Sequence, residues 1–248
     1  MYKTDGSVHY DGIENEINTI NLLNSFSIYE ETVQKRGGTK QKEDAIAGNQ
    51  KISIKKKSGL QNGSFDWINT SKYNDVISDN FKSFIENVKE FRTLPESILK
   101  DNTFIEQVRD KFNVLCDSCL NGLTDKDIKY ILENGMRNCL VDFDIVVNDT
   151  KAKTVFVFPF ENHPVNHYLN NNYTISLQGK GKSSRKVIFS DGVNEYDCGL
   201  RIRITSNNGI NAFLGLSKAN KNSQVVIKLQ QDNIKELLSS TKHKKYDY

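Results

Sequence analysis

Apolar residues recur every three or four positions near the start of the chain and again through its middle. The first stripe predicts an amphipathic helix over residues 11–24. Phenylalanine-rich stripes predict two more helices over 81–91 and 104–119, and Thr124 is a suitable N-cap for a short helix that ends before Gly135. Stripes of this kind are typical of a helical core.

Between these helices the spacing changes to alternation. Residues 43–57 contain two short alternating runs joined by a Gly-Asn pair, which predicts a β-hairpin. Because strand side chains alternate, Ile52 and Ile54 fall on one face of the second run. Lys55 falls on the other face, where the hairpin would hold it near Asp44 of the first run.

After residue 140 the pattern is again that of strands, separated by Asn, Gly and Ser. The expected strands cover 141–147, 154–160, 173–177, 187–189, 200–205, 210–216 and 224–229. The remaining expectations are a strand at 27–34, a loop at 58–64, a last helix over 232–239 and a loose basic tail at 242–248.

The predicted fold class is therefore α+β. A chain of 248 residues can form one large domain or two small ones, and we expect a single domain made of three consecutive parts. Residues 1–75 carry the elements of a catalytic core, residues 76–138 form a helical segment, and residues 139–248 form a β-rich part.

The composition limits the partners that we expect for the protein. Lys and Arg number 34 against 31 Asp and Glu, so any contact with nucleic acid must come from local basic clusters. Two such clusters are 51–57 and 180–186, and Lys40 and Lys42 follow a Gly-Gly pair that would permit close approach to phosphates. Without a long apolar run or an apolar leader, we expect a cytoplasmic protein with no membrane partner.

Two motifs have metal-like spacing. Cys116 and Cys119 form a CxxC inside an apolar helical stripe, so they are either half of a zinc site or packing residues; with no second pair, packing is favoured. His163 and His167 are flanked by a proline and asparagines, which favours a loop. The four cysteines fit a reducing compartment.

The hairpin has two interpretations. A carboxylate beside an ammonium on adjacent strands is the minimum equipment for metal-assisted hydrolysis of a phosphodiester. The alternative is an ordinary surface hairpin with a solvated lysine face. Glu16, at the border of the first helical stripe, is likewise either a solvated flank or a group aimed at a site.

A resemblance bears on this choice. Gly12 and Glu16 on a first helix, then Asp44, then Ile-Ser-Ile-Lys at 52–55, together resemble the PD-(D/E)xK nuclease core. The similarity is greatest to type II restriction endonucleases, in which such a strand, a Gly/Ser loop and an Asn-Thr-Ser segment (here 69–71) occur together. The resemblance implies a mixed sheet flanked by helices and a β-rich C-terminal part that recognises DNA.

The resemblance also implies roles for the residues. Asp44 would bind Mg²⁺, Lys55 would assist the attacking water, and Glu16 would be the helix acid that faces the site. The second acid of the motif falls on Ser53, which carries no charge. Either Glu16 replaces it as a metal ligand or Ser53 works through a metal-bound water, which leaves one or two metal ions open.

Double-stranded DNA is the implied partner. Phosphate contacts position a protein on DNA, and forked or amide side chains read the bases. The candidate DNA contacts are Lys40, Lys42, Lys57, Ser183, Ser184, Arg185, Lys186, Arg201, Arg203, Asn207 and Asn208. Taken singly, Arg201 and Arg203 are equally explained as a solvated strand face, and the Asn pair as a hairpin turn.

The resulting hypothesis is a Mg²⁺-dependent type II restriction endonuclease that leaves 5′-phosphate ends. Because most sites of such enzymes are palindromic, a homodimer is expected. Two alternatives stay open: a structure-specific or repair nuclease on the same core, and a DNA-binding protein that does not cleave.

Overall fold

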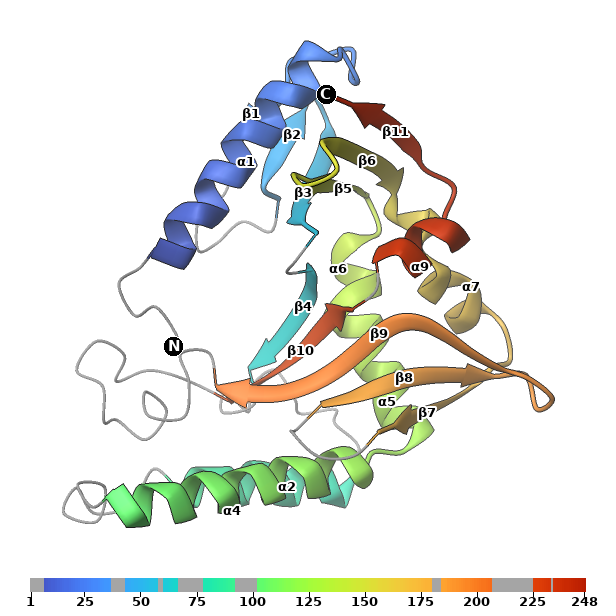
Figure 1. Ribbon diagram of the computed structural model, residues 1–248. Helices are drawn as coiled ribbons and strands as arrows, with labels where there is room; N and C mark the ends of the chain where they lie inside the picture. The colour runs from blue at the N-terminus through green and yellow to red at the C-terminus, as the bar shows by residue number, and fades with distance from the viewer. Residues whose placement is uncertain are drawn as a thin grey trace. The chain divides into compact units, whose positions relative to one another are not determined.

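The computed structural model describes residues 7–36, 43–57, 60–66, 78–91, 102–179, 184–206, 225–232 and 234–248. These residues form an α+β protein with two separate sheets (Figure 1). The chain divides into two compact units, neither continuous in sequence. Unit 1 is Met1–Leu60, Arg137–His167 and Asn233–Tyr248, and unit 2 is Gln61–Met136 and Tyr168–Asp232.

Unit 1 contains a mixed six-stranded sheet in the order β1-β2-β3-β5-β6-β11. Its strands are β1 (Gln34–Lys35), β2 (Ala45–Ala47), β3 (Gln50–Lys56), β5 (Phe143–Asp149), β6 (Thr154–Pro159) and β11 (Lys244–Asp247). The central strands β3 and β5 are parallel, and every other neighbouring pair is antiparallel. Segments from the start, middle and end of the chain thus share one sheet (Figure 1).

Helix α1 (Ser7–Ser25) packs against one face of this sheet. Ile20 and Leu23 of the helix meet Ile52 and Ile54 of β3 in one apolar cluster. Burying each of these side chains stabilises the fold by about 2 kcal/mol. The short elements of unit 1 are α6 (Asn138–Leu140), a 3₁₀ turn η3 (Phe160–Asn162), α7 (Pro164–Asn170), which reaches into unit 2, and α9 (Ile234–Ser240).

Unit 2 contains a five-stranded sheet in the order β4-β10-β9-β8-β7. Its strands are β4 (Leu60–Asp66), β7 (Thr174–Gln178), β8 (Ser184–Ser190), β9 (Glu195–Ser206) and β10 (Val225–Gln231). Its helices are α2 (Asp79–Phe91), α4 (Asn102–Asn121) and α5 (Asp125–Leu132), followed by a π-helical turn η2 (Glu133–Arg137). Helix α4 packs against β8 and β9, and α2 packs against α4.

Most predicted elements are present. The first helix, the 43–57 hairpin, the helices of the middle and the Thr124 N-cap, which forms a capping box with Asp127, are confirmed. The strand expected at 210–216 lies outside the described residues. None of the helices in the described part of the chain combines the length and apolar character needed to span a bilayer.

Four local predictions are wrong. Residues 27–34 form a strand only at their end, because Asn24 exchanges two side-chain hydrogen bonds with the backbone of Val33 and Ser27 has a φ of 48°. Residues 60–64 are part of β4 rather than a loop. The helix after Thr124 continues through Gly135 by a π-helical turn and α6.

The fourth is the basic tail, which forms β11 at the edge of the unit 1 sheet. Tyr246 explains this, because it stacks on Phe26 with ring centroids 5.6 Å apart and packs against the apolar cluster of unit 1. Lys244 and Lys245, which precede Tyr246, stay exposed. The aromatic ring of Tyr246 therefore anchors an otherwise polar segment to the sheet.

The β-rich part is likewise not one piece. Strands β5, β6 and β11 complete the sheet begun by the N-terminal hairpin, whereas β7 to β10 join β4 in the other unit. The two compact units therefore interleave along the chain, and each takes elements from more than one of the three predicted parts.

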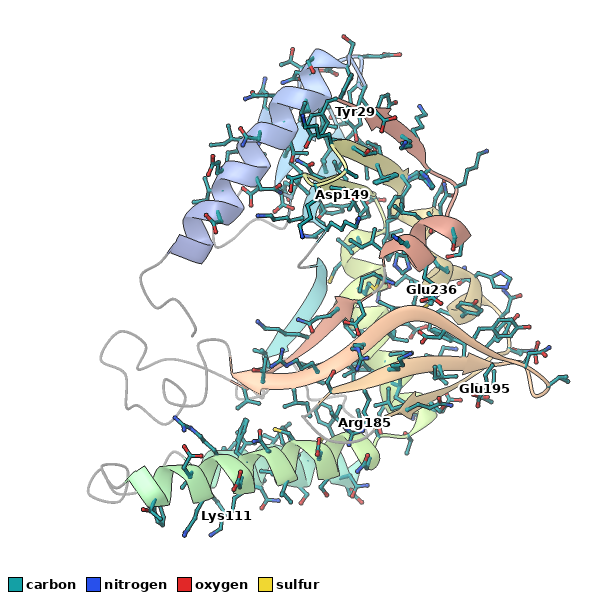
Figure 2. The ribbon with its side chains drawn as sticks, in the orientation of Figure 1. Tyr29, Lys111, Asp149, Arg185, Glu195 and Glu236 are labelled. Carbon is teal, nitrogen blue, oxygen red and sulfur yellow. The ribbon has the colours of Figure 1, made fainter. Side chains whose placement is uncertain are left out.

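Arg185 connects the two layers of unit 2 (Figure 2). Its guanidinium is 3% exposed and donates to Asn121 at 3.0 and 3.2 Å and to Asp117 at 3.3 Å, both on α4. We expect Arg185→Met to lower the free energy of unfolding by about 3 kcal/mol, because Asp117 and Asn121 lose the buried donor that joins β8 to α4. Urea unfolding measures the change. Asp117→Asn, at the more exposed end of the pair, should cost less, and equal losses would contradict this assignment.

Candidate active site

The hairpin places Asp44 where its carboxylate meets three groups of β3. The backbone N–H of Asp44 donates to the carbonyl of Ile52 at 3.0 Å, which extends the β2–β3 pairing by one residue. The side-chain Oδ2 then accepts from the Ile54 N–H at 2.7 Å and from the Ser53 hydroxyl at 3.2 Å. Lys55 Nζ lies 3.6 Å from the same oxygen.

The alternation of β3 determines this arrangement. Ile52 and Ile54 are buried against α1, so the intervening Ser53 and the following Lys55 lie on the opposite face of the sheet. Ser53 is 2% exposed, and the side chains of Asp44 and Lys55 are 24% and 21% exposed. The acid and the lysine are therefore held in place yet open to solvent.

The second carboxylate oxygen of Asp44 has a different environment. Among the described residues, Oδ1 accepts no hydrogen bond and makes no ion pair. Oxygen atoms of this kind are the ligands that Mg²⁺ prefers, through one or two carboxylates completed by water and phosphate oxygens. The described residues contain no group of three or more His, Cys, Asp or Glu side chains able to hold a metal ion. Asp44 Oδ1 is thus a ligand that would fit a Mg²⁺ ion completed by water and phosphate oxygens.

Glu16 lies elsewhere. Its carboxylate forms an ion pair with Lys35 at 3.4 Å. Lys35 is paired in register with Ala45, a buried member of the cluster beneath α1, so this ion pair lies on the α1 side of the sheet. The predicted trio of Asp44, Lys55 and Glu16 is therefore divided between the two faces.

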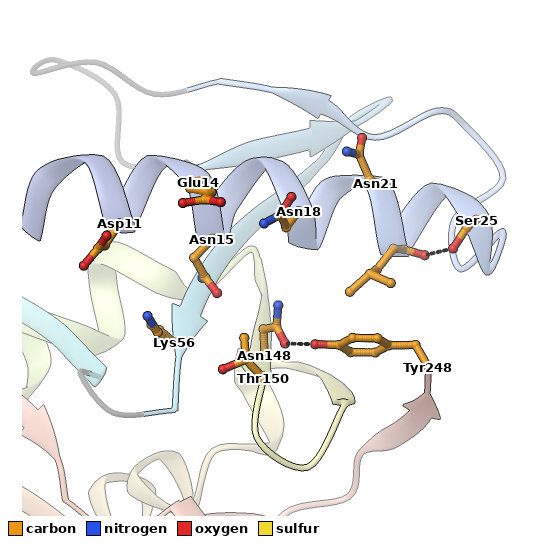
Figure 3. Close-up of a pocket in the computed structure, with 11 residues that line it drawn as sticks. Asp11, Glu14, Asn15, Asn18, Asn21, Ser25, Lys56, Asn148, Thr150 and Tyr248 are labelled. Atoms are coloured by element: carbon orange, nitrogen blue, oxygen red, sulfur yellow. Dashed lines mark hydrogen bonds between the residues drawn. The ribbon is translucent and has the colours of Figure 1, made fainter. Parts of the chain in front are cut away.

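Hydrogen bonds fix the rotation of α1 that causes this division. Thr19 donates to the carbonyl of Asn15 at 2.6 Å and accepts from the buried Asn148 of β5 at 2.9 Å. The Tyr248 hydroxyl donates to the other end of the Asn148 side chain at 3.0 Å (Figure 3). Asn148 and Tyr248 line a pocket of about 700 Å³ between α1 and the sheet, into which Asn15 projects (Figure 3).

Lys57, a predicted phosphate contact, forms an ion pair with Asp149. Asp149 lies at the end of β5 with its side chain 5% exposed (Figure 2), and its carboxylate accepts from Lys57 Nζ and from the N–H of Ala152. Burial alone would raise the pKa of Asp149, but these hydrogen bonds lower it on balance. No sequence pattern selects Asp149, because its partner is 92 residues away in the chain.

A second acid of β5 was also missed. Asp144 accepts a hydrogen bond from the Tyr29 hydroxyl at 2.9 Å. Burial raises the pKa of Asp144, although the bond from Tyr29 opposes the rise. Burial also raises the pKa of Tyr29, with the charge of Asp144 adding to the effect. Asp144 shares the α1 face with Ile52, its partner in register, so it is not a neighbour of Lys55 on the other face.

The predicted DNA contacts of unit 2 are divided by strand alternation. Arg201 and Arg203 lie on one face of β9, as predicted, and Lys186 and Ser184 of β8 are paired with them in register. Arg185 points to the opposite face and is bound by α4, so we assign it to packing rather than to DNA contact. Lys40, Lys42, Ser183, Asn207 and Asn208 lie outside the described residues.

The cysteines of the CxxC motif and the first histidine of the His163–His167 pair are buried in the protein. Cys116 and Cys119 are buried in α4, and burial raises the pKa of each thiol. His163 is buried and stacks on Phe160, and its Nδ1 accepts from the N–H of Val165 at 3.2 Å. His167 lies in α7 rather than in the predicted loop.

Comparisons with protein-family models, with curated proteins and with solved structures find no match to this chain.

The Lys57–Asp149 pair predicts a pH dependence of stability. Folding lowers the pKa of Asp149, so its charge contributes stability above the unfolded-state value of about 3.9, and the contribution is lost as the pH falls through the folded value. We expect Lys57→Gln to lower the free energy of unfolding at neutral pH by about 2 kcal/mol. Asp149→Asn should lose less stability than wild type as the pH falls.

Urea unfolding at neutral pH and at about pH 3 measures both effects. Lys56→Gln, which replaces the exposed lysine next to Lys57, is the matched control for the loss of charge. An unchanged acid dependence in Asp149→Asn would contradict the assignment.

Proposed function

We propose that this chain is a Mg²⁺-dependent endonuclease that cuts double-stranded DNA at specific sites, as type II restriction enzymes do. The observation that carries the proposal is the Asp44 carboxylate, fixed by the Ile54 N–H at 2.7 Å with Lys55 Nζ 3.6 Å away. The mixed sheet flanked by helices agrees with the arrangement that a PD-(D/E)xK resemblance implies.

Each residue has a defined contribution. The hydrogen bonds to Oδ2 orient Asp44 so that its other oxygen would hold the cation. When bound, Mg²⁺ supplies Lewis-acid stabilisation of the phosphate and lowers the pKa of water. The Lys55 ammonium is placed to offset the negative charge that develops on the phosphodiester during in-line attack by water. Cleavage of the bond to the 3′ oxygen would leave 5′-phosphate ends.

The departure at the second acid position affects the number of metal ions. Ser53 donates to Asp44 instead of contributing a second carboxylate, and Glu16 is paired with Lys35. One carboxylate supports a site for one Mg²⁺ whose remaining ligands are water and phosphate oxygens. We infer that Ser53 positions Asp44 and that Glu16 acts on β1 rather than on the metal.

Asp44→Asn and Lys55→Gln test the assignment. We expect Asp44→Asn to reduce the rate of plasmid cleavage in Mg²⁺ by about 10³-fold and Lys55→Gln by about 10²-fold, because each removes a charge beside the reacting phosphate. The assay follows discrete fragments on a gel. Asp142→Asn is the matched control, since Asp142 is 71% exposed at the start of β5. Fragments that persist in Asp44→Asn would refute the proposal.

Glu16→Gln separates two roles for the helix acid. A metal ligand would lose at least 10²-fold in activity and need more Mg²⁺, by analogy with lost ligands at other metal sites. An ion pair with Lys35 at the partly exposed surface is worth less than about 1 kcal/mol. We therefore expect cleavage within about fivefold of wild type and an unchanged Mg²⁺ dependence. A Mg²⁺ titration of the cleavage rate decides between the two roles.

The serine at the acid position also favours a second candidate, a DNA-binding protein that does not cleave. It predicts binding to duplex DNA that weakens with salt and no cleavage in any divalent metal.

Cleavage only at flaps, nicks or mismatches would instead indicate a repair nuclease on the same core. The homodimer proposed for palindromic sites predicts twice the chain mass in light scattering.

A further inference from the structure

Two positive side chains of unit 2 face each other across neighbouring strands. Arg203 of β9 is paired in register with Lys228 of β10, and Ser184 of β8 is paired with Arg203 from the other side. We call these three residues the cation row. Lys228 was not among the candidates found in the sequence, because only the pairing of β9 with β10 places it beside Arg203.

The cation row lies on the sheet face that α4 does not cover. Ile202 and Ile204 of β9 are fully buried on the α4 side, where Arg185 is bound by Asp117 and Asn121. Alternation places Arg203 and Ser184 on the other face, where both side chains are partly exposed. The row therefore lies on a surface of unit 2 rather than within its core.

The neighbouring cations of the same face are neutralised. Lys186 pairs with Asp197 at 2.7 Å, and Arg201 forms an ion pair with Asp232. Within the described ranges, neither Arg203 nor Lys228 has a carboxylate at ion-pair distance. Burial lowers the pKa of Lys228, and the charge of Arg203 lowers it further.

This arrangement is unfavourable unless an anion is present. Like charges directly opposite each other on adjacent strands destabilise a sheet, and partial burial increases the cost. A phosphate oxygen between the two strands would match both charges: the guanidinium offers a planar fork of donors, the ammonium a compact charge and the serine a hydroxyl donor.

We propose that the cation row of Ser184, Arg203 and Lys228 binds a backbone phosphate of double-stranded DNA. The choice of DNA as the source of the phosphate rests on the proposed function, whereas the phosphate chemistry rests on the row itself. A contact of this kind positions the duplex and carries no sequence information. Arg203 and Lys228 are thus assigned to affinity rather than to base recognition.

The test uses the full chain and a fluorescently labelled duplex in EDTA, so that binding is measured without cleavage. We expect Arg203→Gln and Lys228→Gln each to weaken binding about fivefold and to reduce the slope of log affinity against log salt by about 0.9. Lys111→Gln is the matched control, because Lys111 is an exposed cation on α4 (Figure 2).

Thermal unfolding without DNA provides the second readout. Relief of the repulsion should leave both variants at least as stable as wild type. A fall in stability that accompanies the loss of binding would assign the pair to folding and overturn the proposal. Binding that weakens no more than in Lys111→Gln would also overturn it.

Further measurements distinguish DNA from a small anion as the source of the phosphate, and they test the cation row separately from the nuclease. Stabilisation by inorganic phosphate that requires the row, with unchanged duplex affinity, would assign the row to a small anion and overturn the DNA assignment. Duplex binding that depends on the row, in a protein that cuts no DNA with Mg²⁺, would support the row and refute the nuclease. Cleavage by the wild type, with unchanged duplex affinity in both row variants, would support the nuclease and refute the row.

Discussion

The alternation of β3 is the constraint on which the candidate site depends. Ile52 and Ile54 are buried against α1, and a slip of one residue in the register would expose both of them. Each contributes about 2 kcal/mol by burial, so the register is strongly specified. Because it is, Ser53 and Lys55 must lie on the other face, where the extension of β2 brings the Asp44 carboxylate to the Ile54 N–H. The core thus positions the charged pair.

The same constraint explains why the helix acid is not beside that pair. The apolar residues of α1 that cover Ile52 and Ile54 place the whole helix on one side of the sheet. The contact of Thr19 with Asn148 then fixes its rotation, and Glu16 meets Lys35 on that side. Asp44 therefore pairs with Lys55 on one face of the sheet and Glu16 with Lys35 on the other, unlike the single cluster that the sequence motif implied.

Alternation acts on unit 2 in the same way. In β8, Ser184 and Lys186 lie on the sheet face that α4 does not cover, which we call the open face. Arg185, between them in sequence, lies on the other face and binds α4. Salt bridges then sort the open face, since Asp197 and Asp232 neutralise Lys186 and Arg201. Arg203 and Lys228 are left facing each other. The buried Arg185 is thus the neighbour in sequence of Ser184, which we propose contacts a phosphate.

The sequence by itself determined what depends on neighbours along the chain. It was sufficient for the helices with strong apolar stripes, the capped start of α5 and the hairpin that joins Asp44 to Lys55, because their contacts span few residues. Only the tertiary structure decided the partners of Glu16, Lys57, Arg185 and Arg203. Alternation gives the face of a strand, but the packed core decides which face is covered and which distant strand lies beside it.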